Sequence, residues 1–64
     1  MKVGDLVKFS KDTPYVAGGT VGLITNKIWN RVDPDLILFE VQYECEEWGT
    51  KHQRFFPSDL EVVQ

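Results

Sequence analysis

Cysteine and histidine are nearly absent from this 64-residue chain, which has one of each. A single cysteine cannot form a disulfide within the chain, and these two residues cannot supply the four Cys or His ligands of a structural zinc site. Small domains often depend on such cross-links, so we expect packing to stabilise this one, either alone or with a partner or a second copy. We also expect no metal, no cofactor and a reducing, cytoplasmic compartment.

Positive charge is also scarce. Seven Lys and Arg residues stand against ten Asp and Glu, giving a net charge of −3. No Lys or Arg lies between Arg31 and Lys51, whereas the acidic residues there are Asp33, Asp35, Glu40, Glu44, Glu46 and Glu47. Nucleic-acid-binding domains usually carry a basic face, so the charge disfavours nucleic acid and favours a basic protein partner.

Long apolar runs and helical periodicity are missing too. No apolar run approaches the roughly 20 residues that span a bilayer, and no signal-peptide pattern follows Met1. No window keeps an apolar stripe at helical spacing for three turns. We therefore expect no contact with membranes and a single small domain, residues 1–64, without long helices.

The chain is instead rich in patterns that are typical of strands. Short runs of alternating or β-branched residues are separated by Gly, Pro, Asn and Asp. A single helical turn is expected at 57–60, and Gly22 indicates a bulge or a strong bend. The five predicted strands are 3–10, 20–28, 36–43, 51–56 and 61–63.

The third of these segments, "LILFEVQY", shows which side chains share a face. Residues 37, 39, 41 and 43 should point one way and residues 36, 38, 40 and 42 the other. We expect Phe9, Phe39 and only one of the neighbours Phe55 and Phe56 in the core, since adjacent strand residues face opposite ways. The fold class is therefore all-β, a small antiparallel barrel whose last strand returns to the first and closes the sheet.

Several stretches resemble known small barrels. "VGDLVKF" followed by "GGTVGLIT" is similar to the KOW motif, and "RFFPSDLEVV" resembles the end of SH3 domains. The chain also resembles the SH3-like subunit of photosystem I and, most of all, short tailed-phage proteins of the cyanophage type. The resemblance implies an SH3-like barrel of about five antiparallel strands, with one short 3-10 turn before the last strand.

Catalytic residues are not expected. Cys45 and His52 are the only candidates for a nucleophile and its base, and no third residue to orient them is evident. The acidic residues beside Cys45 disfavour its thiolate. The glutamates at 44, 46 and 47 lack the spacing of a calcium-binding loop, so we read them as a solvated hairpin end.

Aromatic residues in predicted loops are the candidate binding residues. The SH3-like layout implies that the long first loop lies beside the segment around Pro57, so that Tyr15, Trp48, Phe56 and Pro57 could line a groove. Trp29 lies in a different turn. Trp and Tyr dominate the binding hot spots of interfaces. The alternative is that these rings cap a small core from outside.

Three functions are compatible with these observations. The leading hypothesis is a non-enzymatic, phage-encoded module that docks on a protein partner through its aromatic face. The first alternative is a KOW-like nucleic-acid, ribosome-associated or transcription-associated domain that uses Lys2, Lys8, Lys27, Arg31 and stacking on Trp29. The second is a small self-assembling homo-oligomer, favoured by the two-faced apolar run "LILF".

Overall fold

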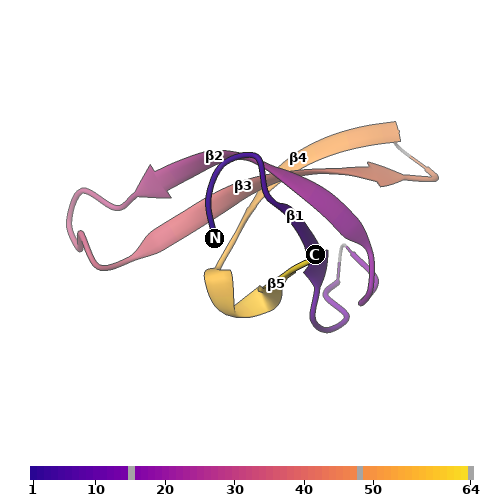
Figure 1. Cartoon of the computed structure of the whole chain (residues 1–64), viewed down its shortest axis with the longest axis horizontal. Coiled ribbons are helices and arrows are strands. Elements are labelled where there is room, and N and C mark those ends of the chain that lie inside the picture. The colour runs from indigo at the N-terminus through magenta and orange to yellow at the C-terminus, as the bar shows by residue number, and fades with distance from the viewer. Residues whose placement is uncertain (15, 48, 64) are drawn as a thin grey trace.

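The computed structural model describes residues 1–14, 16–47 and 49–63. All five strands belong to one antiparallel sheet with the order β4-β3-β2-β1-β5 (Figure 1). The predicted all-β class, the five strands and the 3-10 turn before the last strand are confirmed. The elements are β1 (Leu6–Phe9), β2 (Val21–Trp29), β3 (Ile37–Cys45), β4 (Gly49–Phe55), η1 (Pro57–Asp59) and β5 (Leu60–Val62).

Strand pairing shifts some of the predicted boundaries. Trp29, expected in a turn, is the last residue of β2 because it pairs with Ile37 on β3. Cys45, expected in a connection, ends β3 because it pairs with Gly49 on β4. Cross-strand hydrogen bonds thus extend both hairpins beyond the apolar pattern that predicted them.

The core lies on one face of the curved sheet. Phe9 is at its centre. The centroid of its ring lies 4.7 Å from that of Phe55 and 5.6 Å from that of Tyr43. Both contacts are edge-to-face, a geometry that aromatic pairs prefer. The expected alternation along β3 is confirmed, and Phe55 rather than Phe56 is the buried member of its pair. The buried side chains are Val7, Phe9, Val16, Ile24, Phe39, Val41, Tyr43, Phe55 and Leu60.

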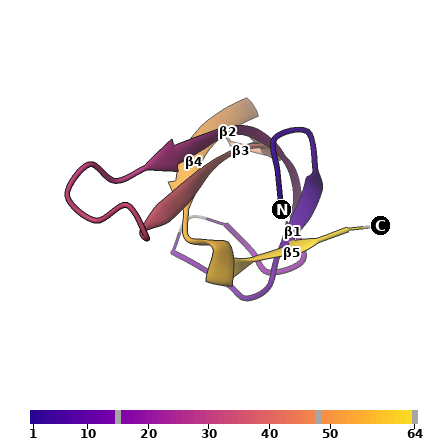
Figure 2. The ribbon, with the colours of Figure 1, turned by 60° about the vertical axis from the view of Figure 1, so that its left-hand side comes forward.

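The C-terminal residues return to β1, as expected, but they do not close the sheet. β5 pairs with β1 through Val7 and Val62, while β4 and β5 are the two outer strands of the sheet order. Between them the chain turns at η1, which opens at Pro57 (Figure 2). Proline has no N–H to continue a ladder, so the strand ends there. The expectation of a closed sheet is wrong.

Gly22 is not the site of the bulge. The register of β2 against β3 shifts between Ile24 and Asn26, which places the extra residue at Thr25. At Gly22 a Cβ atom would stand 2.5 Å from Cγ1 of Val41 and 2.9 Å from the backbone oxygen of Gln42. Glycine here permits a close approach of β3 to β2, the other common reason for glycine in a strand.

Candidate functional site

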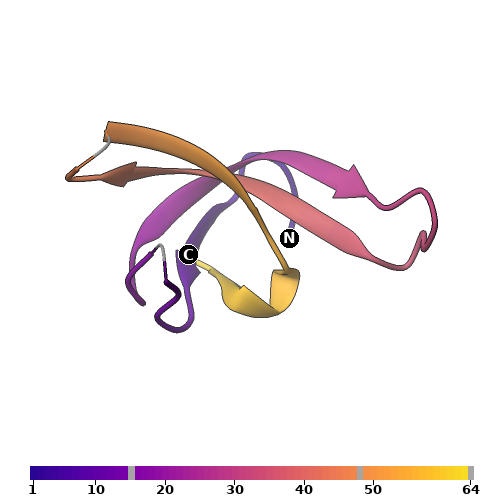
Figure 3. The ribbon, with the colours of Figure 1, turned by 180° about the vertical axis from the view of Figure 1, so that it is seen from behind.

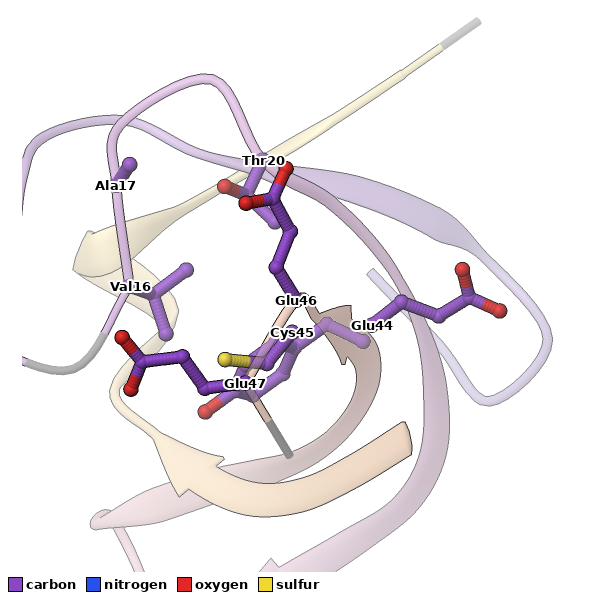
Figure 4. Close-up of a pocket in the computed structure, with 8 residues that line it drawn as sticks. Val16, Ala17, Thr20, Glu44, Cys45, Glu46 and Glu47 are labelled. Atoms are coloured by element: carbon purple, nitrogen blue, oxygen red, sulfur yellow. The ribbon is translucent and has the colours of Figure 1, made fainter. Parts of the chain in front are cut away.

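A hollow of about 520 Å³ lies between the loop that precedes β2 and the end of β3 (Figure 4). Its floor is apolar, because Val16 and the Tyr43 ring are buried and Cys45 is partly buried. The lining residues are Val16, Ala17, Thr20, Tyr43, Glu44, Cys45, Glu46 and Glu47.

Carboxylates surround this floor. Glu46 and Glu47 are exposed, and their side chains flank the hollow in Figure 4. The side chain of Glu44 points away from the hollow. Among the described residues, none of the three glutamates forms an ion pair within 4.0 Å. Lys51 stands on the neighbouring strand opposite Tyr43. The hollow therefore combines an apolar base with negative charge at its rim.

Side-chain caps hold the loop that forms one wall. The backbone N–H of Val16 donates to Oγ1 of Thr13 at 2.9 Å, and that of Gly18 donates to Oδ1 of Asp12 at 2.6 Å. Backbone bonds from Thr13 to Val16 at 2.8 Å and from Gly19 to Phe9 at 2.8 Å close the turn. Such local bonds replace a strand ladder, so Val16 reaches the core from a loop.

Tyr43 joins the hollow to the core. Its hydroxyl donates to Oε1 of Gln53 at 2.6 Å. Burial raises the pKa of the Tyr43 phenol, and the negative charge of a Cys45 thiolate would raise it further. The phenol therefore stays neutral at physiological pH. The Tyr43 side chain therefore adds no charge to the floor of the hollow.

The sequence-predicted binding residues are spread over the molecule. Tyr15 and Trp48 lie outside the described residues, but each adjoins a lining residue in the sequence, Val16 and Glu47 respectively. Phe56 is 49% exposed, and the exposed Pro57 begins η1. Neither lines the hollow. The groove expected from Tyr15, Trp48, Phe56 and Pro57 stays a prediction.

Trp29 is separate from the hollow. It is 58% exposed at the end of β2, where the β2–β3 hairpin extends beyond the rest of the sheet in Figures 1 and 3. The Lys27 ammonium lies 5.1 Å from its ring centroid, within the range of a cation–π contact. The sequence did not reveal this contact, because Trp29 was expected in a turn, and only as the last residue of β2 does it share a face with Lys27.

Cys45 and His52 are not brought together. Cys45 lies on the core side of β3, whereas His52 pairs with Gln42 on the outer face. Nδ1 of His52 is 3.8 Å from Oε1 of Glu40. The two candidate catalytic side chains therefore point to opposite faces of the sheet.

Sequence reasoning missed Val16, Thr20 and the hollow itself. The acidic run from Glu44 to Glu47 was the available signal, and it was read as a solvated hairpin end. In the described ranges 1–14, 16–47 and 49–63, no group of three or more His, Cys, Asp or Glu residues could hold a metal ion. The same ranges contain no helix long and apolar enough to span a membrane.

Comparison with known proteins adds no relative. The chain matches no protein-family model, no curated protein and no solved structure. Its functional interpretation therefore depends on its own residues.

Proposed function

We propose that this protein is a non-enzymatic interaction module that binds a lysine- or arginine-containing segment of a protein partner in the hollow. One observation supports the proposal: an apolar floor of Val16 and Tyr43 stands beside rim carboxylates that have no ion-pair partner among the described residues. A basic side chain has the complementary form, an apolar stem with a charged head. The stem would lie on the floor and the head would reach Glu46 and Glu47.

Aromatic side chains extend the proposed interface. Tyr15 and Trp48 adjoin the two walls of the hollow in sequence, and a Trp or Tyr face attracts a cation within about 6 Å. Phe56 and Pro57 are exposed and would contact a neighbouring part of the same partner. The net charge of −3 would steer a basic partner during encounter.

Calorimetric titration with a capped dodecapeptide of alternating lysine and alanine tests the charge requirement. The double variant Glu46→Gln, Glu47→Gln should weaken binding by up to about fivefold for each charge removed. The matched control, Asp35→Asn with Glu61→Gln, removes the same net charge elsewhere and should change affinity less. Added salt should weaken binding to the native protein. Equal losses in both double variants would refute the hollow as the site.

The same titration tests the aromatic residues. Trp48→Ala should weaken peptide binding more than Trp29→Ala, with little change in the thermal unfolding midpoint. If Trp48→Ala leaves the affinity unchanged and only lowers the midpoint, Trp48 is a core residue and the aromatic part of the proposal fails.

A second candidate function has one specific observation behind it. Trp29 is largely exposed, Lys27 lies over its ring, and Arg31 is exposed two residues further on. An exposed ring flanked by cations suits stacking of a single-stranded base. Filter binding of oligothymidylate at several salt concentrations tests this: a steep salt dependence that is lost in Trp29→Ala would support it. No measurable affinity at low salt would reject it.

A further inference from the structure

The outer edge of β4, on the side away from β3, is unpaired among the described residues. β4 ends the sheet order, so no strand of the described residues pairs with its outer side. Its pairing with β3 runs without a bulge from Gly49 to Phe55, and Figure 3 shows it crossing from the β3–β4 turn to η1. The opposite edge, β5, has only three residues. A long, regular edge is a template for another extended segment.

The backbone groups that face this edge follow from the hairpin. The N–H of Asn30 donates to the carbonyl of Leu36 at 3.1 Å, and hydrogen-bonded pairs alternate along an antiparallel ladder. Even-numbered residues of β3 therefore bond to β2, and odd-numbered ones bond to β4. The β4 residues between those partners, Thr50, His52 and Arg54, direct their N–H and C=O groups to the outer edge.

Charge distinguishes β4 from the rest of the chain. β4 contains Lys51 and Arg54 and no acidic residue, which gives it a formal charge of +2. Because the whole chain has a net charge of −3, the rest of the chain has a charge of −5. A hollow of about 390 Å³ follows the strand, lined by His52, Gln53, Arg54 and Phe55. Lys51 and Arg54 lie on opposite faces of the strand, so each face of β4 carries one of these basic side chains.

Two acidic groups of β3 offset part of this charge, because Glu44 stands opposite Thr50 and Glu40 stands opposite Arg54. Glu40, the cross-strand neighbour of Arg54, is 3.8 Å from His52 through its Oε1 atom. Arg54 is exposed and forms no ion pair within 4.0 Å with any described residue. Its guanidinium can therefore pair with a carboxylate from outside.

We propose that the free edge of β4 binds an extended segment of another protein that carries acidic side chains at alternate positions. The segment would add a sixth strand, bonded to the backbone of Thr50, His52 and Arg54. Its carboxylates would lie on the face that carries Arg54, because alternate residues of a strand share one face. A second copy of this chain is a poorer occupant, because pairing β4 with β4 would bring together two strands of charge +2, neither of which supplies a carboxylate. The site adjoins the hollow, because Glu44 lines the hollow and stands opposite Thr50, but the hollow has a rim of opposite charge.

A nitrogen-15 NMR titration with a capped hexapeptide of alternating glutamate and threonine tests this. The largest amide shifts should fall at Thr50, His52 and Arg54. The same peptide with lysine in place of glutamate should cause no such shifts. Shifts centred on Val16 and Thr20, or equal effects of both peptides, would overturn the proposal. Shifts that grow with protein concentration in the absence of peptide would instead indicate pairing between copies, and would overturn it too.

Two variants separate the backbone from the charge. His52→Pro removes one outward N–H and no bond to β3, so the fold should persist while peptide binding is lost. Arg54→Gln should weaken binding by up to about fivefold, and its matched control Arg31→Gln, in the turn after β2, should not. If His52→Pro unfolds the domain, Arg54→Gln against Arg31→Gln still decides the question, and equal affinities would overturn the proposal.

Discussion

Tyr43 shows how one residue serves both packing and surface chemistry. Its ring packs edge-to-face against Phe9 and forms part of the hollow floor, while its hydroxyl donates to Gln53. A buried neutral phenol costs little if its hydroxyl is bonded, whereas a buried phenolate would be costly. The raised pKa of Tyr43 is the consequence, and it predicts how stability depends on pH.

We expect the stability that Tyr43 contributes to disappear in alkali. Because its pKa is higher in the folded state than in the unfolded one, the unfolded chain loses its proton first as the pH rises. The contribution is complete below a pH of about 10 and declines above it. In urea unfolding, Tyr43→Phe should cost about 0.5–1.5 kcal/mol near pH 7, and the gap to the native protein should narrow above pH 10. A gap that stays constant to pH 11 would contradict this.

Residue-scale prediction succeeded where the strand period alone decides the outcome. Alternation placed Phe39 and Tyr43 in the core, and it required Phe55 and Phe56 to separate. Which of the two is buried could not be predicted, because it depends on the pairing of Phe55 with Phe39 across β3 and β4. The bulge predicted at Gly22 was wrong for a similar reason, since the side chain that excludes a Cβ there belongs to another strand.

At the scale of elements, β5 is the shortest strand and completes the core. It carries Leu60, which is 7% exposed, into the interior opposite Phe9 on β1. η1 precedes it, and the backbone N–H of Leu60 bonds to the carbonyl of Pro57. The predicted return of the last strand to the first is confirmed by the pairing of Leu60 with Phe9.

Leu60→Ala should therefore lower the free energy of unfolding by about 2–5 kcal/mol. Its neighbour Glu61 is exposed and pairs only at 3.7 Å with Lys8, so Glu61→Ala should stay within about 0.5 kcal/mol. Urea denaturation followed by circular dichroism compares the two variants. Equal stability of both would show that β5 adds little to the core.

At the scale of the whole molecule, the sheet order and the hollow were beyond sequence patterns. An open sheet and a closed barrel have the same strand count and alternation, and they differ only in whether the two outer strands pair. The hollow joins residues 16–20 to residues 43–47, which are distant in sequence and belong to a loop and a strand end. The local pattern of apolar residues does not predict which distant segments lie next to each other.

The surface divides into regions of opposite charge. The rim of the hollow is acidic, with Glu46 and Glu47, while the strand that follows, β4, is basic. Together the two proposals predict a protein that holds two differently charged segments, and they make separable predictions for peptides of opposite sign. The hollow is the better supported of the two proposed sites, because it combines an apolar floor with carboxylates that lack an ion-pair partner among the described residues.

The most direct test is a nitrogen-15 NMR map of the lysine–alanine dodecapeptide on the native protein. We predict that the largest amide shifts fall at Val16, Ala17, Thr20 and Cys45, around the hollow, and that they vanish in the Glu46→Gln, Glu47→Gln variant. Shifts centred on Trp29, or on β4, or unchanged in that variant, would contradict the assignment of the hollow as the binding site.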